Sequence, residues 1–204
     1  MRGLLRKDFY LLWSYCRLMP LFLLAFILFS AFSSDGQWPF FIYYPCILSS
    51  VLPVNLLAYD DAEHWLTYCD TLPVTRRQYV SGKYIMSLIC AGTIFLLSAV
   101  AAVVRLCRSG AFNPADLTDQ LAVLAMISLL SSALTMPPLF KFGAQKGRIV
   151  FIGVIGIFCG LSAILDTPDL SGVSLPIALL PILAMVIFAV SWLLSIRFYE
   201  KREI

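Results

Sequence analysis

The chain carries little charge for its size. Of its 204 residues, 13% are charged and 60% are hydrophobic, whereas an ordinary soluble domain is about 25% charged and about 45–50% apolar. So few charges cannot cover the surface of a soluble globule of this length. The composition therefore excludes a soluble enzyme, a secreted domain and a disordered tail, and it predicts an integral membrane protein.

Residues that enzymes need are also scarce. The chain has one histidine and neither an HExxH helix nor a GxSxG turn, which excludes the common zinc protease and serine hydrolase arrangements. His64 with Cys69 or Asp70 is the nearest apparent pair, and no third orienting group accompanies it. The six cysteines form no CxxC pair, so neither a metal site nor a disulfide framework is predicted. We expect no catalytic residue and no metal.

The sequence also lacks a nucleotide-binding loop and a nucleic-acid-binding surface. The sequence has no GxxxxGK[ST] phosphate loop, so ATP hydrolysis by that route would require a separate subunit. The net charge is only +3, and no basic stripe with interleaved aromatics indicates a nucleic-acid partner. No charge lies in the middle of an apolar run, which argues against a proton-coupled carrier, an ion pump and a voltage sensor.

What the chain does have is six uncharged runs of 17, 24, 21, 21, 17 and 27 residues. About 20 apolar residues cross the hydrocarbon core of a bilayer. The runs are continuously apolar rather than alternating, so they predict helices and not barrel strands. We expect one all-α transmembrane domain over residues 1–204, with six spans near 18–34, 38–59, 80–104, 120–140, 149–165 and 174–196.

The basic residues indicate the orientation. With six spans, 13 of the 15 Lys and Arg residues fall on the side that holds both termini. Only Arg105 and Arg108 fall on the other side. Because basic residues concentrate on the cytoplasmic side, we expect a multi-pass protein with both termini in the cytoplasm and the lipid bilayer as its surroundings.

Residues 1–17 mix leucines and aromatics with Arg2, Arg6, Lys7 and Asp8. The spacing predicts an amphipathic helix in the cytoplasmic interface. A basic flank that only orients the first span is the alternative. In the second span, Pro45 and Pro53 are expected to kink the helix.

Residues 60–79 form the most polar segment between two predicted spans. Acidic residues are expected at the beginning of a short helix, where negative charge suits the helix dipole, and Thr75 is the expected N-cap of the third span. Exposed aromatics beside charges make good docking anchors; the alternative is that they rest among lipid headgroups. The two interpretations stay open at this point. The residues concerned are Asp60, Asp61, Glu63, His64, Trp65, Leu66 and Tyr68.

The order of the polar motifs resembles that of a type-2 ABC-transporter permease subunit. Two stretches carry the resemblance. The first is similar to the family's pattern of an acidic residue, Trp, then LPVSR, Val and KY, although Thr75 stands where Ser is commoner. It comprises Asp61, Glu63, Trp65, Thr71-Leu72-Pro73-Val74-Thr75-Arg76-Arg77, Val80, Lys83 and Tyr84. The second, similar to FG-x-x-KGR, comprises Lys141-Phe142-Gly143 and Lys146-Gly147-Arg148.

The resemblance implies a transmembrane subunit of an ABC exporter in a bacterial cytoplasmic membrane. Two permeases, identical or paralogous, would pair, and each would dock a cytoplasmic ABC ATPase that holds the ATP and Mg; no cofactor would bind to this chain. Short members resemble exporters of amphipathic peptides. The implied ATPase-coupling residues are Asp60, Asp61, Glu63, His64, Trp65, Leu66, Tyr68, Asp70, Leu72, Pro73, Arg76 and Arg77, with Lys141, Phe142, Gly143, Lys146 and Arg148 in the second loop.

Two questions remain open from the sequence. A non-transporting scaffold or sensor that docks a cytoplasmic partner through the same segment is the alternative function. The cargo cannot be identified, but a path without charges would suit a hydrophobic or amphipathic cargo. Candidate path residues on the second span are Phe41, Tyr43, Tyr44 and Asn55.

Overall fold

Every element in the described part of the chain is a helix. The computed structural model describes residues 2–15, 18–32, 40–63, 65–69, 71, 75–108, 114–143, 149, 152–153, 155–156 and 179–200. The helices are α1 (Arg2–Tyr15), α2 (Leu18–Phe32), α3 (Phe40–Leu48), α4 (Val51–Ala62), α5 (Trp65–Cys69), α6 (Arg76–Arg108), α7 (Pro114–Phe142) and α9 (Leu180–Glu200).

Four helical segments of the described residues are long and apolar enough to cross a membrane. They are Ile42–Ala62, Arg76–Arg108, Leu117–Phe142 and Leu180–Glu200. A fifth would be counted if α1 and α2, which are inclined by 70° to each other, formed one broken span. The all-α membrane class is thus confirmed. The sixth span and the orientation stay predictions, and most of the span expected near 149–165 lies outside the described residues.

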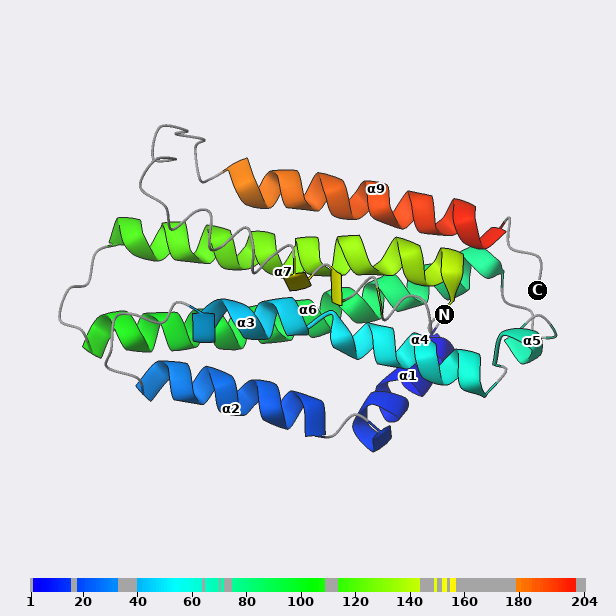
Figure 1. Cartoon of the computed structure of the whole chain (residues 1–204), viewed down its shortest axis with the longest axis horizontal. Coiled ribbons are helices and arrows are strands. Elements are labelled where there is room, and N and C mark those ends of the chain that lie inside the picture. Colours follow the sequence, from blue (N-terminus) through cyan, green and yellow to red (C-terminus); the bar gives the residue numbers. More distant parts are fainter. Residues whose placement is uncertain are drawn as a thin grey trace.

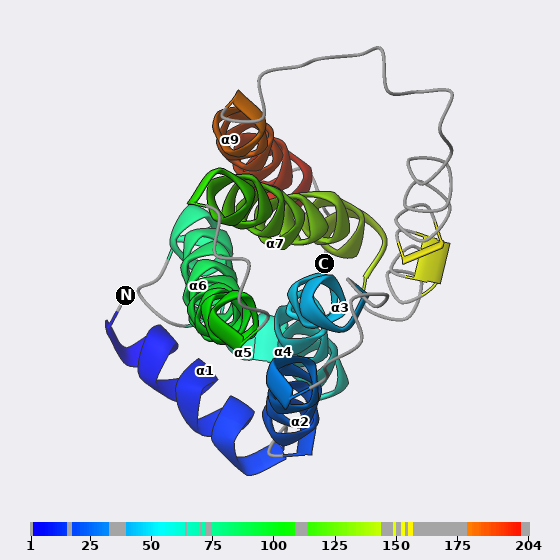
Figure 2. The ribbon, with the colours of Figure 1, turned by 90° about the vertical axis from the view of Figure 1, so that its left-hand side faces the viewer.

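The long helices run side by side along the longest axis of the molecule (Figure 1). α6 is the central element, because it contacts α1, α2, α3, α4, α7 and α9, and the view along the bundle shows α1 lying across its outside (Figure 2). α5, the start of α6 and the C-terminal end of α9 share one end of the bundle (Figure 1). An ion pair between Arg77 and Glu200 joins these two helix ends.

The second span is interrupted between α3 and α4, as its prolines predict. Pro53 has no N–H to donate to the Ser49 carbonyl, and the Leu52 amide approaches that carbonyl instead, at 3.4 Å. The hydroxyls of Ser49 and Ser50 donate to the carbonyls of Cys46 and Ile47, at 2.6 and 2.9 Å. Local side chains therefore satisfy backbone groups that a bilayer could not.

Tyr84 joins α6 to α9 inside the bundle. Its hydroxyl lies 2.8 Å from Ser191 Oγ and 2.6 Å from Ser195 Oγ, and its ring stacks on Trp192 with centroids 5.6 Å apart. Ser191 in turn donates to the Ala133 carbonyl of α7 at 2.7 Å. Buried hydroxyls that find partners in this way fix the position of α9 against α6 and α7.

The start of α6 confirms the predicted N-cap. The Gln78 amide donates to Thr75 Oγ1, and the Thr75 amide donates to Gln78 Oε1, both at 3.3 Å. This reciprocal pair is a capping box, which satisfies two of the amides that a helix start leaves unpaired. The helix that carries the third span therefore begins at Arg76, four residues before the expected start of the span.

Candidate partner-docking site around α5

α5 is a five-residue helix at the end of the bundle (Figure 1). One side is anchored, because Cys69 is buried in the cluster that contains Tyr79 and Val80 of α6. The other side is open: Tyr68 is 55% exposed, and its ring lies 5.2 Å from the ring of half-buried Trp65. α5 therefore offers a fixed aromatic pair at the surface.

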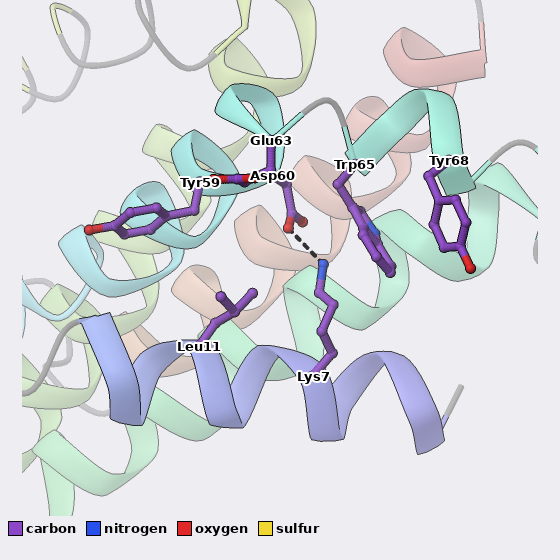
Figure 3. A pocket seen from close by; sticks show the side chains of 7 residues that line it. All are labelled: Lys7, Leu11, Tyr59, Asp60, Glu63, Trp65 and Tyr68. Carbon is purple, nitrogen blue, oxygen red and sulfur yellow. Dashed lines mark hydrogen bonds and ion pairs between the residues drawn. The ribbon is translucent and has the colours of Figure 1, made fainter.

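A cleft of about 560 Å³ separates α5 and the end of α4 from α1. In Figure 3, Lys7 reaches from α1 across this space, between the Asp60 carboxylate and the Trp65 ring. Acidic, basic and aromatic groups share the walls. Its lining residues are Lys7, Leu11, Tyr59, Asp60, Glu63, Trp65 and Tyr68.

Lys7 ties α1 to α5. Its ammonium lies 3.8 Å from the centre of the Trp65 ring, a cation–π geometry, and it donates to Asp60 Oδ1 at 2.6 Å. Burial and the nearby Lys83 ammonium lower the pKa of Lys7, while Asp60 opposes this shift. The Trp65 ring is thus held by α1, a separate element of the chain.

At the base of the cleft lies a largely buried charge cluster, which we define as Lys7, Asp8, Asp60 and Lys83. Lys83 Nζ lies 2.8 Å from Asp8 Oδ1 and 2.6 Å from Asp60 Oδ2. The Tyr79 hydroxyl also donates to Asp60 Oδ2, at 2.8 Å. Two positive and two negative charges cancel, so the cluster can persist in a region of low polarity. It joins α1, α4 and α6.

The structure corrects one expectation about Asp60, while its docking role stays a prediction. The sequence placed this residue at the beginning of a helix and on the docking surface. Instead α4 continues to Ala62, so Asp60 lies in the last turn, where the helix dipole disfavours negative charge. Lys7 and Lys83 offset that cost. Asp60 lines the cleft but is only 2% exposed.

Among the remaining candidates of the first loop, Glu63 is exposed and lines the cleft. Asp61 and Arg76 are half-buried. Arg77 is exposed and paired with Glu200. Leu66 lies in α5. His64, Asp70, Leu72 and Pro73 lie outside the described residues.

The described part of the second loop is the end of α7. Gly143 has a φ of 81°, and its amide donates to the Leu139 carbonyl at 2.9 Å, which closes the helix in the left-handed conformation that glycine adopts readily. Phe142 is 51% exposed. The Lys141 ammonium lies 5.1 Å from the centre of the Phe142 ring and 5.3 Å from that of Phe198. Lys146 and Arg148 lie outside the described residues.

The candidate path residues belong to α3 and α4. Tyr43 and Tyr44 pack against the core that α2, α3 and α6 share, and the Tyr44 ring lies 5.5 Å from that of Phe26. Asn55 is half-buried in α4, and Phe41 lies in α3. These contacts describe packing inside one copy of the chain.

Sequence reasoning missed the roles of four members of this site: Lys7, Asp8, Tyr79 and Lys83. Lys7 and Lys83 were interpreted as charges that orient the spans, and Lys83 also as part of the first family motif. Asp8 did carry a signal, because it stands four residues from both Leu4 and Leu12 and therefore on the stripe that faces the bundle. An acidic residue on that stripe requires a buried cationic partner.

Comparison with known proteins identifies the class to which the chain belongs. Residues 3–200 match the model of a family described as ABC-2 family transporter protein. Because the match covers nearly the whole chain, this protein belongs to that family, whose members are permease components of ABC transporters. No curated protein and no solved structure gives a significant match to the chain.

Proposed function

We propose that this chain is the permease subunit of an ATP-driven exporter and that α5 docks into a separate ABC ATPase subunit. The observation that carries the proposal is the fixed aromatic pair of α5. Tyr68 is exposed at the end of the bundle, and the Lys7 ammonium contacts the Trp65 ring and fixes its position. Rigid aromatic anchors beside charged groups are the features that dominate the energetics of protein docking.

The charge cluster suggests how a docked ATPase would act on the membrane helices. A push on α5 would reach α1 through the contact of Trp65 with Lys7, and α6 through the pairing of Asp60 with Lys83. Short ionic contacts between buried groups resist distortion, since separating them exposes a charge to an apolar surrounding. ATP-driven closure of two ATPases would thus displace α5, α1 and α6 together.

The proposal extends to the assembly and its cargo. Two copies of this chain, or this chain and a paralogue, would pair in a bacterial cytoplasmic membrane, with both termini and the two loops in the cytoplasm. The long uncharged stretches within the spans, such as 84–104 and 120–140, favour amphipathic peptides or other hydrophobic cargo. ATP-dependent uptake of a labelled amphipathic helical peptide into inside-out vesicles is the assay for that cargo class.

The experiment for the coupling role is purification of the tagged chain from native membranes in mild detergent, with identification of stable partners. We expect a separate phosphate-loop ATPase to co-purify. The double variant Trp65→Ala/Glu63→Gln should lose it, because the variant removes the aromatic anchor and the exposed carboxylate at the cleft.

Trp13→Ala is the matched control. Trp13 is also an exposed aromatic, 70% accessible, but it lies on α1 and does not line the cleft. The control should retain the ATPase. Recovery of the wild-type chain without any ATPase would instead favour a scaffold or sensor, and retention of the ATPase by the double variant would remove α5 as the docking element.

A further inference from the structure

A second hollow lies on another side of α1, against α6 rather than α4. It has a volume of about 670 Å³, and its walls are mainly apolar or aromatic. Phe9 and Tyr10 are 58% and 71% exposed, so this face of α1 is not covered by the described part of the chain. The lining residues are Leu5, Arg6, Phe9, Tyr10, Met86 and Ile89.

Arg6 makes the groove positively charged. On the same helix, Lys7 and Asp8 are neutralised within the charge cluster. Arg6 is exposed and forms no ion pair with any carboxylate of the described residues. The groove therefore combines an apolar floor with one uncompensated guanidinium, and its complement is an anionic group that carries an apolar chain.

The depth of the groove in the bilayer follows from α6. Its 33 residues measure about 50 Å at the rise of an α-helix, which exceeds the ~30 Å hydrocarbon core. Lys83 immediately precedes the uncharged stretch 84–104, so Met86 and Ile89 lie one to two turns inside the apolar region. α1 is inclined by 70° to α2 and contacts α6, so the predicted third span places this contact near the bilayer boundary, where lipid phosphates lie.

We propose that this groove binds an anionic phospholipid. Its phosphate pairs with Arg6, and an acyl chain lies along Phe9, Met86 and Ile89. An arginine donates several hydrogen bonds to one phosphate, and an interfacial helix with aromatic residues gains from burying them among acyl chains. The proposal concerns the chain and its bilayer alone and does not rest on the ATPase partnership.

The test is native mass spectrometry of the purified full-length chain in detergent. The chain is offered phosphatidylglycerol and phosphatidylcholine with the same acyl chains at equal concentration. We expect wild type to retain phosphatidylglycerol in excess. Arg6→Gln should lower that excess by about fivefold, the factor expected for one basic residue at an anionic lipid surface.

Arg77→Gln is the matched control. Arg77 is also an exposed arginine, but Glu200 already pairs with it, so the excess should not change. A second variant, Ile89→Trp, fills the apolar half of the groove without altering charge. Ile89 is 47% exposed, so the change is tolerated by the fold, and it should also reduce phosphatidylglycerol retention.

Three results would overturn the proposal. The first is equal retention of the two lipids by wild type. The second is Arg6→Gln retaining phosphatidylglycerol as wild type does. In the third, Arg6→Gln and Ile89→Trp convert a two-copy particle to a single copy with lipid retention unchanged, which would make the groove a contact between copies. Circular dichroism of each variant confirms that the helices are retained.

Discussion

Lys83 is buried and lies between two carboxylates, those of Asp8 and Asp60. It is 2% exposed, and its ammonium lies within 2.8 Å of two carboxylates. Burial raises the pKa of Asp8, and Lys83 opposes that shift. Because neither charge is stable in this position without the other, the helix that carries Asp8 depends on a residue of the third span.

This dependence predicts a non-additive pair of substitutions. Asp8→Asn leaves three charged members with an excess of one positive charge, and Lys83→Met leaves an excess of one negative charge. Each should destabilise the protein by about 3–5 kcal/mol, as expected when one partner of a buried ion pair is removed. The double variant should cost much less than the sum. Unfolding in mixed micelles by increasing SDS measures these differences.

An exposed ion pair supplies the comparison. Arg77→Gln removes the partner of Glu200 at the surface, where water replaces the lost contact, so the unfolding midpoint should change little. Strict additivity of Asp8→Asn and Lys83→Met would mean that the two side chains do not share a buried environment, and the charge cluster would have to be abandoned.

At the scale of elements, helices were predictable where their signals are local. Continuous apolar runs anticipated α6, α7 and α9, and the Thr75–Gln78 capping box is contained in four residues. The charge cluster was not predictable in the same way. Its hydrogen bonds join residues 53 and 75 positions apart, and hydrophobic patterns do not specify which helices meet. Asp60 was consequently assigned to the beginning of a helix rather than to the last turn of α4.

The end of α7 provides a prediction for one element. Gly143→Ala places a Cβ on a residue with φ of 81°, which should destabilise the second loop by about 1–2 kcal/mol. Gly82→Ala is the opposite case: it lies within α6, and no neighbouring atom lies within 4 Å of the position that an added Cβ would take. That change should stabilise by about 0.5–1 kcal/mol.

The same SDS titration measures both glycine variants. If Gly143→Ala and Gly82→Ala shifted the unfolding midpoint equally, the left-handed turn after Phe142 would be absent in the membrane-embedded protein.

At the scale of the molecule, α9 leaves a large apolar surface uncovered by the described part of the chain. Only 22% of its most apolar stretch is buried, and exposed leucines and valines, with Ile182 and Met185, line its outer side. In a bilayer this face meets either lipid or another subunit. If the proposed pairing holds, light scattering with subtraction of the detergent should give a particle of two 22.8 kDa chains. A single-chain mass would contradict pairing of identical copies.

The long separation between Asp8 and Lys83 also constrains how the chain is made. Lys83 follows Asp8 by 75 positions, a distance that the ribosome covers in roughly 4–15 s at ordinary rates of synthesis. During that interval Lys83 is not yet available to pair with Asp8, so the Asp8 carboxylate stays hydrated. The first helix therefore stays at the membrane surface and reaches its final position only after the third span has been inserted, so the beginning of the chain assembles later than its order of synthesis suggests.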